Sequence, residues 1–164
     1  MAEREGSVEI ALVERKLSRA WAFLSGEERA FHHTLGPNDS LRFAEFSFFM
    51  PMTLPRETRH GGVGVLIQHG DAIRVAANMF GVERQHIQEA DLRDACAEVC
   101  NVFADCIATH FGAGQAVKIG LPRAASPTEY AHIAENSVTR VVYQACAGPH
   151  SLLIVLYDSL SVPS

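Results

Sequence analysis

The stretch DACAEVCNVFAD, residues 94–105, has the spacing of an amphipathic helix. Its apolar residues recur three and four positions apart, which places them on one side of a helix: Cys96, Val99, Cys100 and Phe103. Asn101 lies in the interior of this helix, although asparagine is a mediocre helix former because its short amide competes with the backbone for hydrogen bonds. The presence of Asn101 there therefore needs a reason other than helix stability.

The opposite side of this helix carries polar head groups. At about 100° per residue, four side chains fall within an arc of roughly 60° that faces away from the apolar stripe: Asp94, Glu98, Asn101 and Asp105. We call these four residues the polar crest. A face of this kind is usually only solvated, but this one contains no Lys or Arg for the i,i+4 ion pairs that stabilise exposed helices. Its neighbours, such as Ala97, are short. The crest therefore suits a surface that presses against another protein.

Composition restricts the class of protein. The chain of 164 residues has a normal content of apolar and charged residues, which predicts a single globular domain over residues 1–164. A net charge of −5 argues against nucleic-acid binding, which leaves a basic footprint. We see no signal peptide, and the longest apolar run, residues 152–157, is too short to span a bilayer. The four cysteines lack the spacing of a disulfide framework, so we expect reduced thiols and a cytoplasmic protein with no membrane partner.

The spacing of apolar residues predicts an α+β fold, with two long helices packed on a mostly antiparallel sheet. The long helices are expected at residues 8–24, opened near Ser7 and with an extension over residues 27–33, and at residues 91–111. A short helix, residues 72–81, would have Asp71 as its N-cap and Gly81 at its end. Strands are expected at residues 41–50, 63–68, 116–122, 137–147 and 151–158, with a turn at 61–64 and a loop at 123–136. The order of elements indicates a degenerate internal duplication.

The residues around the crest resemble a known family. The run DACAEVCN, residues 94–101, is similar to the D-A-x-x-E-x-x-N helix of the CheC/CheX/FliY phosphatases of bacterial chemotaxis. The segments GGVGVLIQHGDAIRVAANMFG (61–81) and AVKIGLPRA (116–124) resemble strands and a short helix of the same family, so the resemblance covers roughly residues 61–158. The first long helix contains no Glu-x-x-Asn motif, and in this respect the chain resembles the CheX branch of the family. That branch implies a homodimer assembled through sheet edges.

The resemblance implies a phosphatase that hydrolyses the aspartyl phosphate of a CheY-like response regulator. It implies that Asn101 orients the attacking water and that Glu98 pairs with a lysine beside the phosphorylated aspartate of the regulator. The implied Mg²⁺ would be bound by the regulator, so we expect no cofactor on this chain. Asp94, Ala97 and Asp105 would contribute to partner docking. Asp105 departs from the family, which usually has Gly at that position, and a carboxylate there could repel the phosphoryl group.

Other readings of the sequence remain open. Asp105 leaves room for a non-catalytic module of the same fold that docks on a regulator or a motor component, and a purely structural role is a third possibility. A metal site would need convergent ligands, whereas Cys96, Cys100, Cys106 and His110 spread along several turns of one helix. We expect the buried cysteines to act as small apolar residues and predict no metal site. The usual motifs of small-molecule enzymes do not occur in the sequence.

Overall fold

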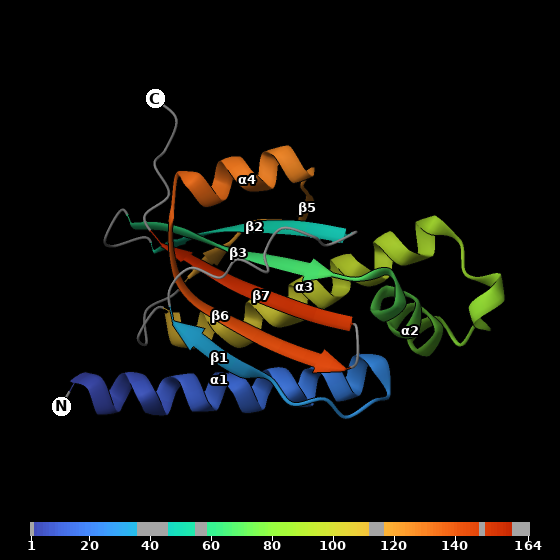
Figure 1. Ribbon diagram of the computed structural model, residues 1–164, viewed down its shortest axis with the longest axis horizontal. Coiled ribbons are helices and arrows are strands. Elements are labelled where there is room, and N and C mark those ends of the chain that lie inside the picture. Colours follow the sequence, from blue (N-terminus) through green and yellow to red (C-terminus); the bar gives the residue numbers. More distant parts are fainter. Residues whose placement is uncertain (1, 36–45, 55–58, 112–116, 148–149, 159–164) are drawn as a thin grey trace.

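The computed structural model describes residues 2–35, 46–54, 59–111, 117–147 and 150–158 (Figure 1). Its elements follow in the order α1 (Ala2–Ser25), β1 (His32–Leu35), β2 (Phe46–Leu54), β3 (Arg59–Ile67), α2 (His69–Phe80), the 3-10 turn η2 (Arg84–His86), α3 (Glu89–Phe111), β4 (Lys118–Ile119), β5 (Arg123–Ala124), α4 (Pro127–Glu135), β6 (Val138–Ala147) and β7 (His150–Asp158). The expected α+β fold, with two long helices on an antiparallel sheet, is confirmed. Within the described residues, no helix is both long enough and apolar enough to cross a membrane.

All seven strands belong to one sheet in the order β1-β6-β7-β3-β2-β4, with β5 also paired to β2, and every pair is antiparallel. Each half of the chain contributes a long helix, a short edge strand and a pair of adjacent long strands. The short strand of each half pairs with the other half, because β1 joins β6 and β4 joins β2. This exchange agrees with the internal duplication that the order of elements indicates.

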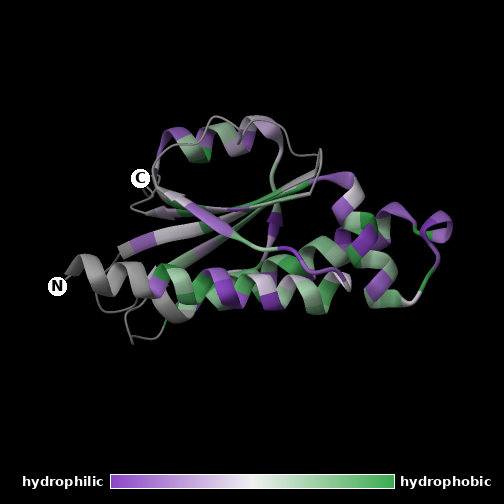
Figure 2. Ribbon diagram, turned by 60° about the horizontal axis from the view of Figure 1, so that its bottom comes forward, coloured by the Kyte–Doolittle hydropathy of each residue, from purple (hydrophilic) through white to green (hydrophobic). Residues whose placement is uncertain are grey.

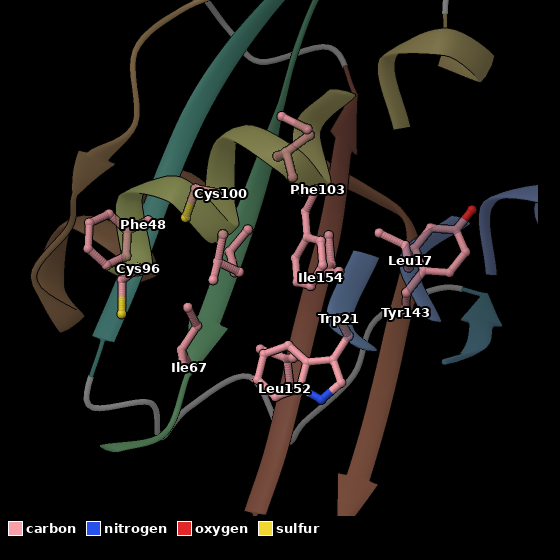
Figure 3. Packing of buried hydrophobic residues seen from close by; sticks show 14 of the residues in the cluster. Leu17, Trp21, Phe48, Ile67, Cys96, Cys100, Phe103, Tyr143, Leu152 and Ile154 are labelled. Atoms are coloured by element: carbon pink, nitrogen blue, oxygen red, sulfur yellow. The ribbon is translucent and has the colours of Figure 1, made fainter. Parts of the chain in front are cut away.

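Helices cover both faces of the sheet: α1 and α3 lie on one face and α4 on the other (Figures 1 and 2). Successive side chains of a strand point to opposite faces, and β7 follows this rule in full. Leu152, Ile154 and Leu156 join the core under α1 and α3, whereas the alternate residues join the core under α4: Leu153, Val155 and Tyr157. In Figure 3, Trp21 from α1 and Phe103 from α3 pack around Leu152 and Ile154.

The segment 123–136, expected to be a loop, contains β5 and α4, so that prediction was wrong. The side chain of Ser126 caps α4 by accepting a hydrogen bond from the backbone N–H of Glu129 at 3.1 Å, and Pro127 occupies the first turn. Tyr130 anchors the helix to the sheet, because its hydroxyl oxygen accepts a 2.6 Å hydrogen bond from the buried hydroxyl of Tyr157. A serine cap and one buried tyrosine therefore hold α4 against the second face.

The glycines at positions 61–64 lie inside β3 rather than in a turn, which corrects the expectation for this segment. A Cβ atom on Gly62 would lie 2.3 Å from the ring of Phe49. A Cβ atom on Gly64 would lie 2.7 Å from the hydroxyl oxygen of Tyr130. The strand needs glycine here because two aromatic rings occupy the space above it.

Several expected element boundaries were also wrong. Helix α1 begins at Ala2, not near Ser7, and ends at Ser25, where Gly26 takes the left-handed φ of 73°. Residues 27–33, expected to extend that helix, are not helical, and His32 and His33 belong to β1 instead. The N-cap of α2 is Gln68 rather than Asp71, although Gly81 closes α2 with a φ of 63°, as expected.

The expected strands differ mainly in length. Strand β2 continues through Pro51 to Leu54, and the strand expected at 116–122 is reduced to Lys118–Ile119. Parts of the strands expected at 41–50 and 116–122 lie outside the described residues, namely 41–45 and 116. The two closing strands, β6 and β7, lie where they were expected.

A buried ionic cluster fastens α2 to the end of α1. The side chain of Arg29 donates to Asp71 at 3.0 Å and to Glu27 at 2.9 Å, and its guanidinium lies 5.1 Å from the ring centre of Trp21. Arg29 and Asp71 are both buried, with side-chain exposures of 5% and 1%. Burial lowers the pKa of Arg29, but the hydrogen bonds and charges of Asp71 and Glu27 together outweigh this effect and raise that pKa. Asn78 of α2 adds a hydrogen bond of 2.9 Å to the carbonyl oxygen of Leu24.

Asp71→Ala should destabilise the protein, because it leaves the buried Arg29 guanidinium without its most buried partner. We expect a loss of about 3 kcal/mol in the free energy of unfolding, which lowers Tm by roughly 6–12 °C for a chain of this size. Thermal unfolding followed by circular dichroism measures this loss. The matched control is Glu89→Ala, which breaks the exposed ion pair with Arg93 and should change stability by less than about 1 kcal/mol. Equal effects of the two substitutions would contradict this account.

Candidate functional site on α3

Helix α3 runs from Glu89 to Phe111, two residues longer at its start than expected. A carboxylate oxygen of Asp91 accepts the backbone N–H of Gln88 at 2.9 Å, which satisfies a donor at the helix start. The apolar side of the helix is fully buried against the sheet and against α1 and α2: Leu92, Ala95, Cys96, Val99, Cys100, Phe103, Ala104 and Ile107. The ring of Phe103 meets the ring of Phe31 edge to face, with centroids 5.6 Å apart.

The same packing directs the polar crest outward. All four of its residues, Asp94, Glu98, Asn101 and Asp105, are exposed, and Ala97 beside them is half-buried. The structure thus brings the candidate residues of the sequence onto one open face of one helix. Glu98 and Asn101 are one turn apart, about 4.5 Å along the helix axis. A rigid helix therefore presents a carboxylate and a neutral amide together, in a fixed relation, to whatever binds this face.

The chemistry of this pair is that of recognition and positioning. The carboxylate of Glu98 can accept charge-assisted hydrogen bonds from a cation on a partner. The amide of Asn101 can accept a hydrogen bond through its oxygen and donate through its NH2 group, so it can orient a water molecule without adding charge. Asp94 and Asp105 extend the negative charge by one turn on either side.

Lys16 lies near the site but was not predicted from the sequence, because it belongs to α1 and not to α3. Burial raises the pKa of the Cys106 thiol, the charge of Lys16 lowers it, and the charge of Asp105 raises it. Lys16 of α1 and Asp105 of α3 thus both lie close to the same thiol. The spacing within residues 94–105 holds no information about Lys16; only the packing of α1 against α3 brings it there.

The cysteines of α3 are part of the core rather than of a site. Cys96 and Cys100 are buried, and burial raises the pKa of Cys96 to about 12 and that of Cys100 well above its ordinary value. Both side chains are therefore neutral thiols at physiological pH and pack as small apolar groups (Figure 3). Among the described residues, no group of three or more His, Cys, Asp or Glu side chains is placed to hold a metal ion. The side chain of His110 lies outside the described residues.

The hollow at the edge of the sheet lies away from the crest. It is lined by residues of β1, β6 and the segment before β1: Ala30, His32, Thr34, Gln144 and Cys146. Strand alternation places Gln144 and His32 on the face of the sheet opposite to α3, because their chain neighbours Tyr143 and Phe31 belong to the core under α1 and α3. This hollow cannot contribute to chemistry at Glu98 or Asn101.

Comparison with known proteins identifies the fold. The chain is similar to the chemotaxis protein CheX of Vibrio vulnificus, with 12% identity, a TM-score of 0.68, and coverage of 92% of this chain and 98% of that chain. It is also similar to CheX in a crystallised CheX–CheY–BeF3–Mg²⁺ complex of Borrelia burgdorferi, with 15% identity, a TM-score of 0.65, and coverage of 92% and 97%. A third similar structure is that of the FliM–SpeE complex of H. pylori, with 8% identity, a TM-score of 0.60, and coverage of 95% and 86%.

Sequence comparison adds no relative. No model of a known protein family matches the chain, and no curated protein matches it. The structural similarity nevertheless extends over nearly the whole of both chains in each comparison. It confirms, at the level of the fold, the resemblance that the crest and its surroundings indicated. This chain therefore has the fold of the CheX and CheC-like chemotaxis proteins.

Proposed function

We propose that this protein is a CheX-like phosphatase that accelerates hydrolysis of the aspartyl phosphate of a CheY-like response regulator. The observation that carries the proposal is the joint exposure of Glu98 and Asn101 on one face of α3 in a CheX-like fold. Support for the partner comes from a structural neighbour, since the Borrelia burgdorferi CheX was crystallised with CheY. The polar crest would enter the phosphorylated cleft of the regulator.

Asn101 is proposed to orient the attacking water. An aspartyl phosphate is already labile, and its carboxylate leaving group needs little assistance. The remaining task is to place a water molecule in line with the phosphorus atom and to exclude other arrangements. A neutral amide suits this task because a charged side chain would be repelled by the phosphoryl group or would bind it too firmly in the ground state. The water-orienting glutamine of small GTPases is a comparable group.

Glu98 is proposed to fix the depth and direction of docking. Its carboxylate would pair with a lysine of the regulator that lies beside the phosphorylated aspartate. Docking removes water from this ion pair, so the pair contributes more to binding than an ion pair on an open surface. Asp94, Ala97 and Asp105 complete the docking surface around Glu98. The Mg²⁺ ion that the resemblance implies belongs to the regulator and not to this chain.

A homodimer assembled through sheet edges is also part of the proposal. In the described part of the chain, β1 is the last strand at its edge of the sheet, and its outward side has no strand paired to it. An open edge of this kind can add a strand from a second copy.

A non-catalytic docking module of the same fold is the second candidate. It is favoured by Asp105, whose carboxylate lies one turn from Asn101 at the position where the family usually has Gly. The FliM–SpeE complex is also similar in fold, so this fold is not confined to complexes with CheY. In this alternative the crest binds a regulator or a motor component without hydrolysis.

Asn101→Ala should remove the acceleration of dephosphorylation, with a loss of roughly 100-fold or more, because misplacing a reacting group is costly. The measurement is phosphate release from a regulator phosphorylated with acetyl phosphate. Since Asn101 is exposed and Ala is the better helix former, Tm should not fall. Arg93→Ala, on the same helix but outside the crest, serves as the control and should leave the rate unchanged. Full activity of Asn101→Ala would refute the proposed role of this amide.

Glu98→Lys should weaken docking before it affects folding. It replaces attraction to the regulator lysine with repulsion, so we expect Kd for the phosphorylated regulator to rise by a factor of roughly 30 or more. Titration calorimetry or fluorescence anisotropy measures Kd, and Glu98→Gln should give an intermediate value. Reversal of the regulator lysine to Glu should restore part of the binding to Glu98→Lys and to no other variant. Unchanged Kd in Glu98→Lys would place the contact elsewhere.

A further inference from the structure

We propose that the flank of α1 that faces α3 is the second half of the docking face, with Lys16 and Phe23 contacting the same phosphorylated regulator as the polar crest. This inference rests on the proposed function and adds to it a second helix, a positive charge and an exposed aromatic ring.

Two hydrogen bonds identify the flank of α1 that faces β1. The backbone N–H of Phe31 donates to the hydroxyl of Ser18 at 3.1 Å, and the backbone N–H of His33 donates to the carboxylate of Glu14 at 3.0 Å. At about 100° per residue, Lys16 points about 180° away from the mean direction of Ser18 and Glu14. Helix α1 contacts β1 at one edge of the sheet, whereas α3 contacts β2 and β3 toward the other edge and packs against α1. The flank of α1 opposite to β1, which carries Lys16, is therefore the one that faces α3, in agreement with the effect of the Lys16 charge on the Cys106 thiol.

The crest has a corresponding side that faces α1. Cys106 marks that side of α3, and helical spacing places Val102, Glu98 and Asp105 within about 100° of Cys106, whereas Asn101 lies about 140° away. Val102 is half-buried. Two carboxylates of the crest and one apolar side chain therefore lie between Asn101 and α1.

Phe23 lies further along the same flank of α1, only about 20° around the axis from Lys16. The two helices are packed together and run antiparallel (Figure 1). Seven residues of helix span about 10 Å, so Phe23 should be level with the segment of α3 that holds Glu98 and Val102. Its side chain is 84% exposed, so the ring is available to a partner, and aromatic rings are enriched among the residues that contribute most to protein interfaces.

Charge complementarity selects the occupant of this surface. The crest contains three carboxylates, and a phosphorylated aspartate is itself anionic, so the crest alone would repel the site it is proposed to enter. Lys16 is half-buried and its charge, like that of Asp105, acts on the Cys106 thiol; its apolar stem can lie along α1 while its ammonium group extends toward solvent. It offsets the charge of Asp105 at the point where the family usually has Gly. The combined face, with Lys16 at one end and Phe23 near Glu98, fits the phosphorylated regulator.

The test is a steady-state titration of phosphorylated regulator against the wild-type protein and five variants. We expect Lys16→Glu to raise KM about 10-fold with kcat changed by less than about twofold, because it acts on docking rather than on the water. Arg15→Glu is the matched control, since it makes the same charge change about 100° around the same helix. It should leave KM within about twofold of the wild-type value. Lys16→Met keeps the apolar stem but removes the charge, so its KM should lie between the values of Lys16→Glu and Arg15→Glu. A variant that keeps the stem also separates loss of the charge from loss of packing.

Phe23→Ala provides the second arm of the test. We expect it to raise KM about fivefold, as expected for loss of an aromatic contact at a docking surface. The matched control is Leu121→Ala, because Leu121 is equally exposed, at 86%, but follows β4 near the opposite edge of the sheet from β1. Leu121→Ala should leave KM unchanged.

The outcomes separate this inference from the proposed function. If the wild-type protein accelerates dephosphorylation but Lys16→Glu and Phe23→Ala behave like their controls, the inference is overturned and the phosphatase stands. If the wild-type protein binds the phosphorylated regulator without accelerating its decay, and Lys16→Glu weakens that binding about 10-fold, the docking face is supported and the catalytic role is not. Absence of both binding and acceleration across a panel of purified regulators contradicts both.

Discussion

The burial of one side of α3 determines what the rest of the molecule can do. Phe103 and Ile107 are almost completely excluded from solvent, and Cys96 and Cys100 are buried with them in the same core. A well-packed interior does not tolerate rotation of such a helix about its axis, because every large side chain would lose its contacts. The direction of Glu98 and Asn101 is therefore set by residues that point the opposite way. Packing of the core thus fixes the position of the candidate site on α3.

The second helix depends on a different interaction. The buried contact between Arg29 and Asp71 fastens the segment after α1 to α2, and Asn78 binds the carbonyl oxygen at the end of α1. Helix α1 also packs along α3, on the side of α3 that carries Cys106. A change in the ionic cluster would therefore reach the docking face through the position of α1 rather than through the crest.

The parts of the fold that could be predicted are those with local signals. Apolar spacing gave α3 and the closing strands β6 and β7, and Gly81 marked the end of α2. Helix α4 was missed although Ser126, Pro127 and Glu129 carry a recognisable helix-start pattern. Strand β1 could not be predicted from its polar sequence, since it exists through pairing with β6, more than a hundred residues later. For the same reason the crest could be predicted within one helix, whereas the neighbouring Lys16 could not.

The claim that the crest enters the phosphorylated cleft is tested most directly by photo-crosslinking. A photoreactive amino acid placed at position 101 and another at position 93 would be irradiated with a regulator phosphorylated with acetyl phosphate, and the linked peptides identified by mass spectrometry. The account predicts crosslinks from position 101 to the loops that surround the phosphorylated aspartate, dependent on phosphorylation, and few from position 93. Crosslinks from position 101 to another surface of the regulator, or equal yields from both positions, would contradict it.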